Sequence, residues 1–471
     1  MKIYKLHNFR SKPYGLIEWL VIVLYIILAS ALSYRLIFYP TAQLIPFLAL
    51  ALAAIFIIWR PVLGTALYFL SYPLVPASGD INMMKLVMLL LTVFLFALWL
   101  WRKLKARDHV WSLPEYKWMF LFFIYLGFSP FLGPAYGFSI LDWARDIAPM
   151  LNLLLIPMLV EHFSEKRNKW LFYLIAVPIA VALSRDLINL VSKYISMPFN
   201  PLNYFAYGLS TYHIGLVFCL GIIFFIYRLK PKYFWLAMAI VSLAVTLLTI
   251  TRTVWISVAF SAAQLLFFYT KFRRLSMVLI SLCILAIGWL YFLPQEQAVS
   301  LKTSEQRSSW LGMQSERFYG IRNKDVAVMN RNIEFRQAWR VFLSSPFVGV
   351  GFGYIYRFWR YHVSGLGGSG FWYTNFVHND IVNILAKGGA IGFLLWLAMI
   401  RGFLKRFYEK RRNETGIAMI LSTIGIIAIF NAIFVGSSTP VFQTREAMFF
   451  LSIVMALGLC QWESRDAGTG R

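Results

Sequence analysis

Charged residues are scarce in this chain of 471 residues: they make up 14% of it, against roughly a quarter in soluble domains. Hydrophobic residues make up 60% and aromatic residues 18%, which is more apolar surface than a water-soluble core can bury. Apolar runs of about 20 residues, the length that crosses a bilayer, recur from Leu16 almost to the C-terminus. The composition therefore excludes a soluble globular domain and predicts a polytopic membrane protein.

Cysteines and carboxylates are also few, which argues against two kinds of site. The three cysteines, Cys219, Cys283 and Cys460, all lie inside apolar runs without a pairing pattern, so neither a disulfide framework nor a zinc site is indicated. The chain has 20 acidic residues and no Asp-x-Asp pair. Because hard metal ions prefer carboxylate oxygens, a metal site is poorly supported, and we expect neither a metal nor another cofactor.

Basic residues outnumber acidic ones by 45 to 20 and give a formal net charge of +25. In a soluble protein this excess would suggest a nucleic-acid partner. Here Lys and Arg fall mostly in short segments between apolar runs, where they set the orientation of a membrane protein. We therefore expect a lipid bilayer as partner, no nucleic acid, and a first apolar run that is retained as a helix rather than cleaved as a signal peptide.

Apolar runs bounded by charges, Pro or Gly predict fourteen spans, of which the short ones at 62–78 and 445–461 could be re-entrant. The spans lie near residues 16–37, 42–59, 62–78, 82–101, 117–133, 142–160, 169–192, 209–228, 232–250, 253–270, 275–293, 379–401, 414–435 and 445–461. The positive-inside rule then makes one set of basic loops cytoplasmic, together with both chain ends. These loops are 102–107, 166–169, 228–232, 271–274 and 401–412.

This order divides the chain into three regions: an N-terminal transmembrane bundle of about 11 spans at 1–293, an extracytoplasmic loop region at 294–378, and C-terminal transmembrane helices at 379–471. The loop from Pro294 to Val377 has 84 residues, with ten Lys or Arg against five Asp or Glu. Loops longer than about 60 residues cross a membrane regardless of their charge. The positive excess fits two partners, anionic lipid headgroups or an anionic substrate.

The clearest motifs follow Arg331. An amphipathic segment leads to Pro346, after which Gly349, Gly351 and Gly353 alternate with other residues. Alternating glycines permit positive φ and close backbone approach, as is needed where a chain turns back toward the membrane. A phosphate-binding nucleotide loop is not indicated, because no strand and helix frame these glycines.

In pattern and order, residues from about 200 to 400 resemble the O-antigen ligase and O-antigen polymerase family of bacterial envelope glycan enzymes. That family has an Arg that opens an amphipathic segment before a Pro, then GxGxG, then a His-Asn at the outer end of a helix and a GxxG. The matching residues are Arg331, Pro346, Gly349, Gly351, Gly353, His378, Asn379, Gly389 and Gly392. Upstream, the segment TITRTVW matches a Ser/Thr-rich span end and its following Arg at Thr249, Thr251 and Arg252. Phe335 and Thr251 depart from the more usual Trp and Ser, which affects subfamily assignment more than membership.

The resemblance implies an all-α, polytopic, GT-C-like membrane protein with about 12–14 transmembrane helices and one long extracytoplasmic loop. It implies a glycosyltransferase of the bacterial inner (cytoplasmic) membrane whose active site faces the periplasm or cell exterior. The donor would be a polyprenyl-diphosphate-linked oligosaccharide, and the acceptor a hydroxyl on a glycan, lipid A core or protein. Neither a nucleotide sugar nor a metal would be needed, and attack from the face opposite the diphosphate would invert the anomeric centre.

Breaking a sugar–phosphate bond leaves negative charge on a diphosphate, which must be neutralised at the membrane surface. Arginine binds phosphate in a bidentate manner and stays charged, so Arg252 and Arg331 are the expected diphosphate clamps, with Arg336 in reserve. His378 is the expected catalytic residue, because an imidazole titrates near neutral pH and can accept the proton of the acceptor hydroxyl. Each also has a plainer interpretation: a structural His at a helix end, a snorkelling Arg252, and a solvated loop face at Arg331.

Ionisable side chains inside apolar runs add further candidates for substrate binding, because such groups are often functional. With the helix-start Asn, these candidates are Asn379, Arg185, Arg145 and Asp146. Asp142, Arg145 and Asp146 share one helix face, and Arg185 adjoins Asp186, so these charges could equally pair with one another.

Two other classes of function fit the same sequence. A flippase or transporter of lipid-linked oligosaccharides would also have about fourteen spans, but it needs no long outer loop with a His-Asn helix start. A non-catalytic partner in envelope assembly would tolerate loss of His378. Ligase and polymerase activities share one helical frame, so the sequence does not separate them or identify the sugar.

Overall fold

The computed structural model describes residues 64–65, 68, 83–108, 113–164, 211–226, 232–248, 252–268, 274, 277, 326–360 and 370–460. The predicted spans at 16–37, 42–59 and 169–192, most of 62–78 and of 275–293, and Arg185 lie outside these residues. Helices account for 81% of the described structure and strands for 4%. The predicted all-α, polytopic membrane fold is therefore confirmed.

The described elements follow one another along the chain as a series of apolar helices interrupted by one short hairpin. They are α4 (Met83–Lys105), α5 (Pro114–Phe128), η4 (Ser129–Leu132), α6 (Gly133–Tyr136), α7 (Ile140–Ile147), η5 (Met150–Leu155), α8 (Ile156–Ser164), α10 (Thr211–Ile226), α11 (Lys232–Leu248), α12 (Arg252–Phe268), α16 (Val326–Ser344), β1 (Tyr356–Arg360), β2 (Gly370–Thr374), α17 (Asp380–Asn413), α18 (Gly416–Gly436) and α19 (Arg445–Leu459).

Several of these helices are suited to a bilayer by length and composition. Within the described ranges, three helical segments qualify as membrane spans: Pro114–Tyr136, Asp380–Asn413 and Gly416–Gly436. A fourth is added if the bent pair Ile140–Ile147 and Met150–His162 is one span.

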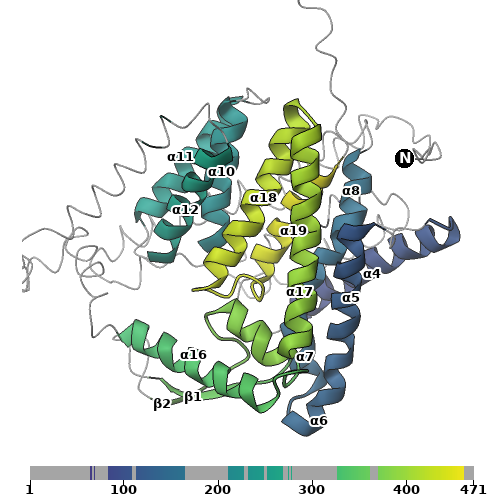
Figure 1. Ribbon diagram of the computed structural model, residues 1–471, viewed down its shortest axis with the longest axis vertical. Helices are drawn as coiled ribbons and strands as arrows, with labels where there is room; N and C mark the ends of the chain where they lie inside the picture. The colour runs from purple at the N-terminus through teal and green to yellow at the C-terminus, as the bar shows by residue number, and fades with distance from the viewer. Residues whose placement is uncertain are drawn as a thin grey trace, which may run out of the picture.

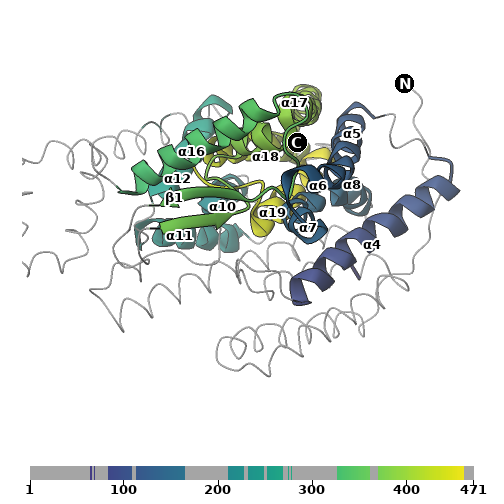
Figure 2. The same cartoon turned by 90° about the horizontal axis from the view of Figure 1, so that it is seen from below.

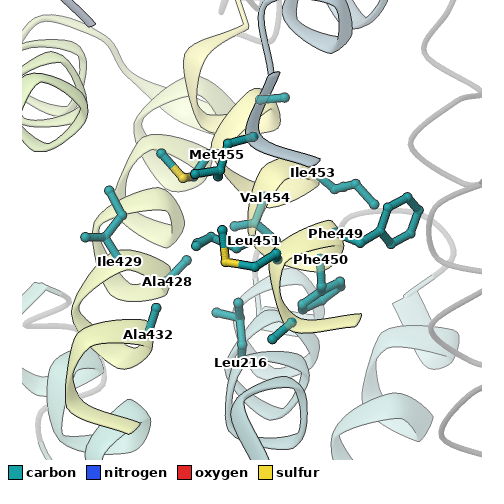
Figure 3. Close-up of a cluster of buried hydrophobic side chains, with 14 of the residues drawn as sticks. Leu216, Ala428, Ile429, Ala432, Phe449, Phe450, Leu451, Ile453, Val454 and Met455 are labelled. Carbon is teal, nitrogen blue, oxygen red and sulfur yellow. The ribbon is translucent and has the colours of Figure 1, made fainter. Parts of the chain in front are cut away.

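Helix α17 is the central element of the bundle, with α5 packed along one side and α18 along the other (Figure 1). Helices α18 and α19 separate α17 from the group formed by α10, α11 and α12. Figure 3 shows why this packing holds: Leu216 of α10, Ala432 of α18 and Leu451 of α19 point into a shared apolar core. Small residues on α18 let the helices approach closely, as is common between helices in membranes.

The bundle has two chemically different ends. Helix α17 finishes in the basic turn Lys410, Arg411 and Arg412, and Arg411 donates a hydrogen bond of 3.2 Å to the carbonyl of Phe268 at the end of α12. At the opposite end α17 starts beside His378, and α16, β1 and β2 lie across it together with α6 and α7 (Figures 1 and 2). We call these the basic end and the His378 end.

The span predicted at 142–160 is bent in the structure, because two helical segments meet there at an angle. Helix α7 ends at Ile147, and the helical segment from Met150 bends away from it by 53°. A capping box between Ser139 and Asp142 starts α7, and Pro149 lacks the N–H needed to continue it. The 3-10 segment η5 follows before α8 resumes α-helical geometry.

The basic segment 401–412, which we predict as a cytoplasmic loop, is helical in the structure. It continues α17 without interruption to Asn413. Most of its residues favour helix, and Glu409 lies near both Lys405 and Arg406, at 4.0 and 3.8 Å, within reach of the attraction that supports i,i+4 and i,i+3 pairs. The helix therefore projects beyond its apolar part.

The hairpin of β1 and β2 was not predicted. The strands are antiparallel, with Tyr356 paired to Thr374 and Arg360 paired to Gly370. Alternation along β1 buries Tyr356 and Phe358, which pack with α16 and the start of α17 in a small second core. This core supports the residues around His378.

Candidate active site

His378 immediately precedes α17, where its neighbour fixes the start of the helix. The side-chain oxygen of Asn379 accepts a hydrogen bond of 3.1 Å from the backbone N–H of Val382, which is the arrangement of an N-cap. The His378 side chain is 23% exposed. Asn379 thus holds the histidine at a helix start with part of the ring accessible.

The imidazole is held by Glu334, a residue that the sequence analysis did not single out. His378 Nδ1 lies 2.7 Å from Glu334 Oε2, and the backbone N–H of His378 donates to the same oxygen at 3.0 Å. Glu334 is on the buried face of α16, with its side chain 4% exposed. A carboxylate at Nδ1 favours the tautomer that carries its proton there and a lone pair on Nε2. Among the described residues Nε2 has no hydrogen-bond partner, so it can accept a proton.

Two arginines lie near this pair. Arg331, one turn before Glu334 on α16, places Nη1 3.5 Å from Glu334 Oε2. Arg360 ends β1 with its guanidinium carbon 4.4 Å from the centroid of the Trp372 ring. Burial raises the pKa of Glu334 above its ordinary value, against the opposing effect of both arginines. Burial lowers the pKa of Arg331 to about 10, assisted by Arg360 and opposed by Glu334, so Arg331 stays positively charged at neutral pH.

The alternating glycines have positive φ, as predicted: +70° at Gly349, +97° at Gly351 and +112° at Gly353. Their segment fits into a break in α17 at Gly389, where φ is 58° and ψ is −169°. A Cβ on Gly349 would fall on the backbone of Lys387, and one on Gly389 would fall on the backbone of Phe347. These glycines therefore allow two backbones to meet; they do not form a phosphate loop.

The break in α17 leaves backbone groups that would otherwise lack partners, and the glycine segment supplies them. Before the break, two carbonyls of α17 accept hydrogen bonds from the N–H groups of the glycine segment. After the break, two N–H groups of α17 donate to carbonyls that precede the glycines. The bonds are Val350 to Ala386 (3.1 Å), Gly351 to Lys387 (2.9 Å), Ala390 to Pro346 (2.8 Å) and Ile391 to Phe347 (3.0 Å). The short helical segment that begins at Asp380, just after His378, is thereby fixed against the long part of α17.

Asp146 and Lys387 form an ion pair in which neither side chain has any exposure. Asp146 also accepts hydrogen bonds from Gly353 N at 2.7 Å and from Asn375 Nδ2 at 2.8 Å. Lys387 donates in addition to the carbonyl of Asn375. A buried pair needs such extra bonds to offset the loss of hydration. The carboxylate of Asp146 is occupied within the protein, where it connects α7, the glycine segment, α17 and the chain just before His378.

The remaining predicted residues are distributed around the same end. Arg145 lies 3.7 Å from Asp142 within α7, so this pair follows the plainer interpretation. Arg336 is exposed on α16, about 140° around the helix from Arg331, and so points away from the Glu334 face. Arg252 is the first residue of α12. Since Phe268 at the other end of α12 lies at the basic end, Arg252 belongs to the His378 end.

The site therefore combines an oriented imidazole, a buried carboxylate behind it, and arginine side chains beside it. Such a set can take a proton from a hydroxyl and stabilise negative charge on a neighbouring group. Among the residues that the structure describes, no three His, Cys, Asp or Glu side chains are placed to hold a metal ion.

Comparison with known families places this site within a matched segment. Residues 237–397 match the family described as O-antigen ligase, and this segment contains α12, α16, the hairpin and the first part of α17. Arg252, Arg331, Glu334 and His378 all fall inside it. A comparison with curated proteins finds no match. The family match confirms the resemblance found in the sequence and supports a function of the O-antigen ligase or polymerase type in general.

Proposed function

We propose that this membrane protein, whose residues 237–397 match the family described as O-antigen ligase, is a polyprenyl-diphosphate-dependent glycosyltransferase. It moves a glycan from the lipid carrier to a hydroxyl of a glycan, lipid A core or protein, without metal, at the outer face of the bacterial inner membrane. One observation carries this proposal: His378, Glu334 and Arg331 meet at one end of an apolar helix bundle. A base and a phosphate-binding cation there are suited to a diphosphate held in lipid headgroups.

Arginine side chains bind the donor. Arg331 is charged and its side chain is 43% exposed, so its guanidinium can bind a phosphate while keeping contact with Glu334. Arg252, at the start of α12, belongs to the same end of the bundle. As the bond between the sugar C1 and the diphosphate oxygen breaks, the electron pair and negative charge move onto the leaving polyprenyl diphosphate. Two arginines stabilise that charge.

His378 activates the acceptor. Its Nε2 takes the proton of the acceptor hydroxyl while the hydroxyl oxygen forms a bond to C1 on the face opposite the diphosphate, which inverts the anomeric centre. Glu334 holds Nδ1–H and stabilises the imidazolium that results. Asn379 acts as the helix cap beneath the base, and Asp146 positions the surrounding segments.

Replacing either clamp arginine is expected to slow transfer. Arg331→Gln and Arg252→Gln should each lower the rate by about 10²–10³-fold, because each removes a charge that stabilises the leaving diphosphate. The measurement uses purified protein in liposomes, a polyprenyl-diphosphate-linked glycan and an acceptor, with initial rates and donor KM determined. Arg412→Gln, in the basic turn of α17, is the matched control and should transfer at the wild-type rate. Wild-type rates in both clamp variants would refute the arginine clamp.

Replacing Glu334 by Gln tests the effect of its negative charge while keeping nearly the same side-chain shape. Glu334→Gln keeps an oxygen that can accept from His378 but removes the negative charge, so kcat should fall about 10- to 100-fold with little change in donor KM. Since burial raises the pKa of Glu334, wild-type kcat should decline as pH falls through that raised pKa, and the variant should lack this limb of the profile. Glu409→Gln at the basic end is the control. An unchanged kcat and pH profile in Glu334→Gln would exclude this role.

The product of the same reconstituted reaction separates the alternatives. A chain of repeats identifies a polymerase, and a single capped acceptor identifies a ligase. Movement of the lipid-linked glycan across the bilayer without a new glycosidic bond would identify a flippase instead. Normal glycan assembly in cells that carry the His378→Ala protein would point to a non-catalytic assembly partner.

A further inference from the structure

Helix α16 carries a second surface, on the side away from Glu334. Phe335, Trp339 and Leu343 are exposed and spaced four residues apart, so they line one face of the helix. Leu343 is 60% exposed. Arg336 and Arg340 are exposed beside them and form a parallel basic row. We call the three apolar residues the apolar stripe and the two arginines the basic row.

The apolar stripe lies level with the start of a membrane span. Helix α16 crosses the His378 end, and the chain after it meets the long part of α17 through the bond from Ile391 N to Phe347 O, 3.0 Å (Figures 1 and 2). Phe347 is 73% exposed, and Ile391 and Leu394 on the span are exposed too. The stripe is therefore followed, through Phe347, by the exposed apolar side chains of α17.

The charge of α16 indicates what lies against this surface. Glu334 is the sole acidic residue of the helix, and it is buried, so every charged side chain on the exposed side of α16 is basic. A helix with such a surface lies in the plane of a bilayer interface, with its apolar face at the acyl boundary and its cations among anionic headgroups. Within the described part of the chain, the opposite face of α16 makes the contacts with β1 and α17.

We propose that α16 is an interfacial helix of the leaflet at the His378 end, with the apolar stripe inserted in the acyl boundary and the basic row bound to anionic phospholipid headgroups. Arg336 thereby serves the bilayer, while Arg331, at the edge of the apolar stripe nearest Glu334, serves the site. The arrangement holds His378 at headgroup depth. On the proposed function, this is the depth at which a lipid-borne diphosphate lies.

The first test measures depth directly and does not involve transfer. Single cysteines at Leu343 and Arg340, in the full-length chain with its native cysteines replaced by alanine, are spin-labelled in liposomes of phosphatidylcholine and phosphatidylglycerol. The label at Leu343 should be more accessible to oxygen than to a polar nickel chelate, and the label at Arg340 should show the reverse. Overturning results are a Leu343 label that favours the nickel chelate, or one shielded from both reagents by another chain segment or a second copy.

The second test keeps the native cysteines and measures headgroup binding. Adding phosphatidylglycerol to phosphatidylcholine liposomes should raise the Tm of the wild type, and the double variant Arg336→Gln/Arg340→Gln should lose most of that rise. Arg412→Gln, at the basic end, should keep it. An equal rise in the double variant would refute the headgroup contact. Either outcome is independent of glycan transfer, so failure of this proposal is distinguishable from failure of the proposed function.

Discussion

His378→Ala is expected to reduce glycan transfer by about 10²–10⁴-fold, the usual contribution of a positioned general base. The loss should fall on kcat, because in the proposed mechanism the donor is held by arginines on α16 and α12 and not by the imidazole. Initial rates with saturating lipid-linked donor measure the effect. Donor binding, determined separately by equilibrium titration, should stay near the wild-type value.

The fold should survive this substitution, since His378 is partly exposed and its removal leaves the Asn379 cap in place. Removal of the imidazole does leave the buried Glu334 without its hydrogen-bond partner. Thermal unfolding of the variant must therefore be measured together with its transfer rate. A second variant, His378→Gln, can still donate to Glu334 while lacking a basic nitrogen. Near-wild-type transfer by this folded variant would contradict a base at His378.

Gly389→Ala is expected to destabilise the protein strongly. At φ 58° and ψ −169° the backbone of Gly389 lies in a region essentially restricted to glycine, and forcing another residue there costs about 1–3 kcal/mol. The added Cβ would also meet backbone atoms of Phe347 and Gly349. Backbone atoms, unlike the end of a flexible side chain, cannot rotate out of the way. Thermal unfolding in detergent and the yield of folded, monodisperse protein measure the effect.

The matched control is Gly127→Ala. Gly127 lies in α5, and a Cβ there meets nothing within 4 Å. Alanine favours helix over glycine by up to about 1 kcal/mol, so this variant should be as stable as the wild type or slightly more stable. Equal stability of Gly389→Ala and Gly127→Ala would show that the glycine segment does not fit into the break of α17 as described.

The sequence was enough to predict features set by local chemistry. Apolar runs bounded by charges predict helices in a bilayer, and the spacing of Gly349, Gly351 and Gly353 predicts the positive φ that they adopt. The position of His378 before an apolar run predicts a histidine at a helix start. These predictions succeed because the causes lie within a few residues of the effect.

Contacts between distant segments were beyond the reach of the sequence. Glu334 lies 44 residues before His378, and Lys387 lies 241 residues after Asp146. The available signal for Glu334 was weak: it is the single acid in a basic amphipathic segment, three residues after Arg331. Nothing local says that its side chain is buried. That depends on how α16 packs across α17.

Two further differences arise because the rules used to predict spans and loops consider only hydropathy and charge. Hydropathy alone treats 142–160 as one apolar run, whereas α7 ends at Ile147 before Pro149, and the helical segments on the two sides differ in direction by 53°. The positive-inside rule assigns the basic residues after Arg401 to a loop. They continue α17 instead, because charged residues are compatible with a helix that extends out of the membrane.

The account rests on the claim that a sugar is transferred from a lipid diphosphate at the His378 end, and analysis of both products of one reaction tests it most directly. Purified protein is given a polyprenyl-diphosphate glycan of known anomeric configuration and an acceptor, with a chelator present. We predict a new glycosidic bond of inverted configuration by NMR, with release of one polyprenyl diphosphate for each bond formed. Retained configuration, release of polyprenyl monophosphate, or no new glycosidic bond would contradict the account.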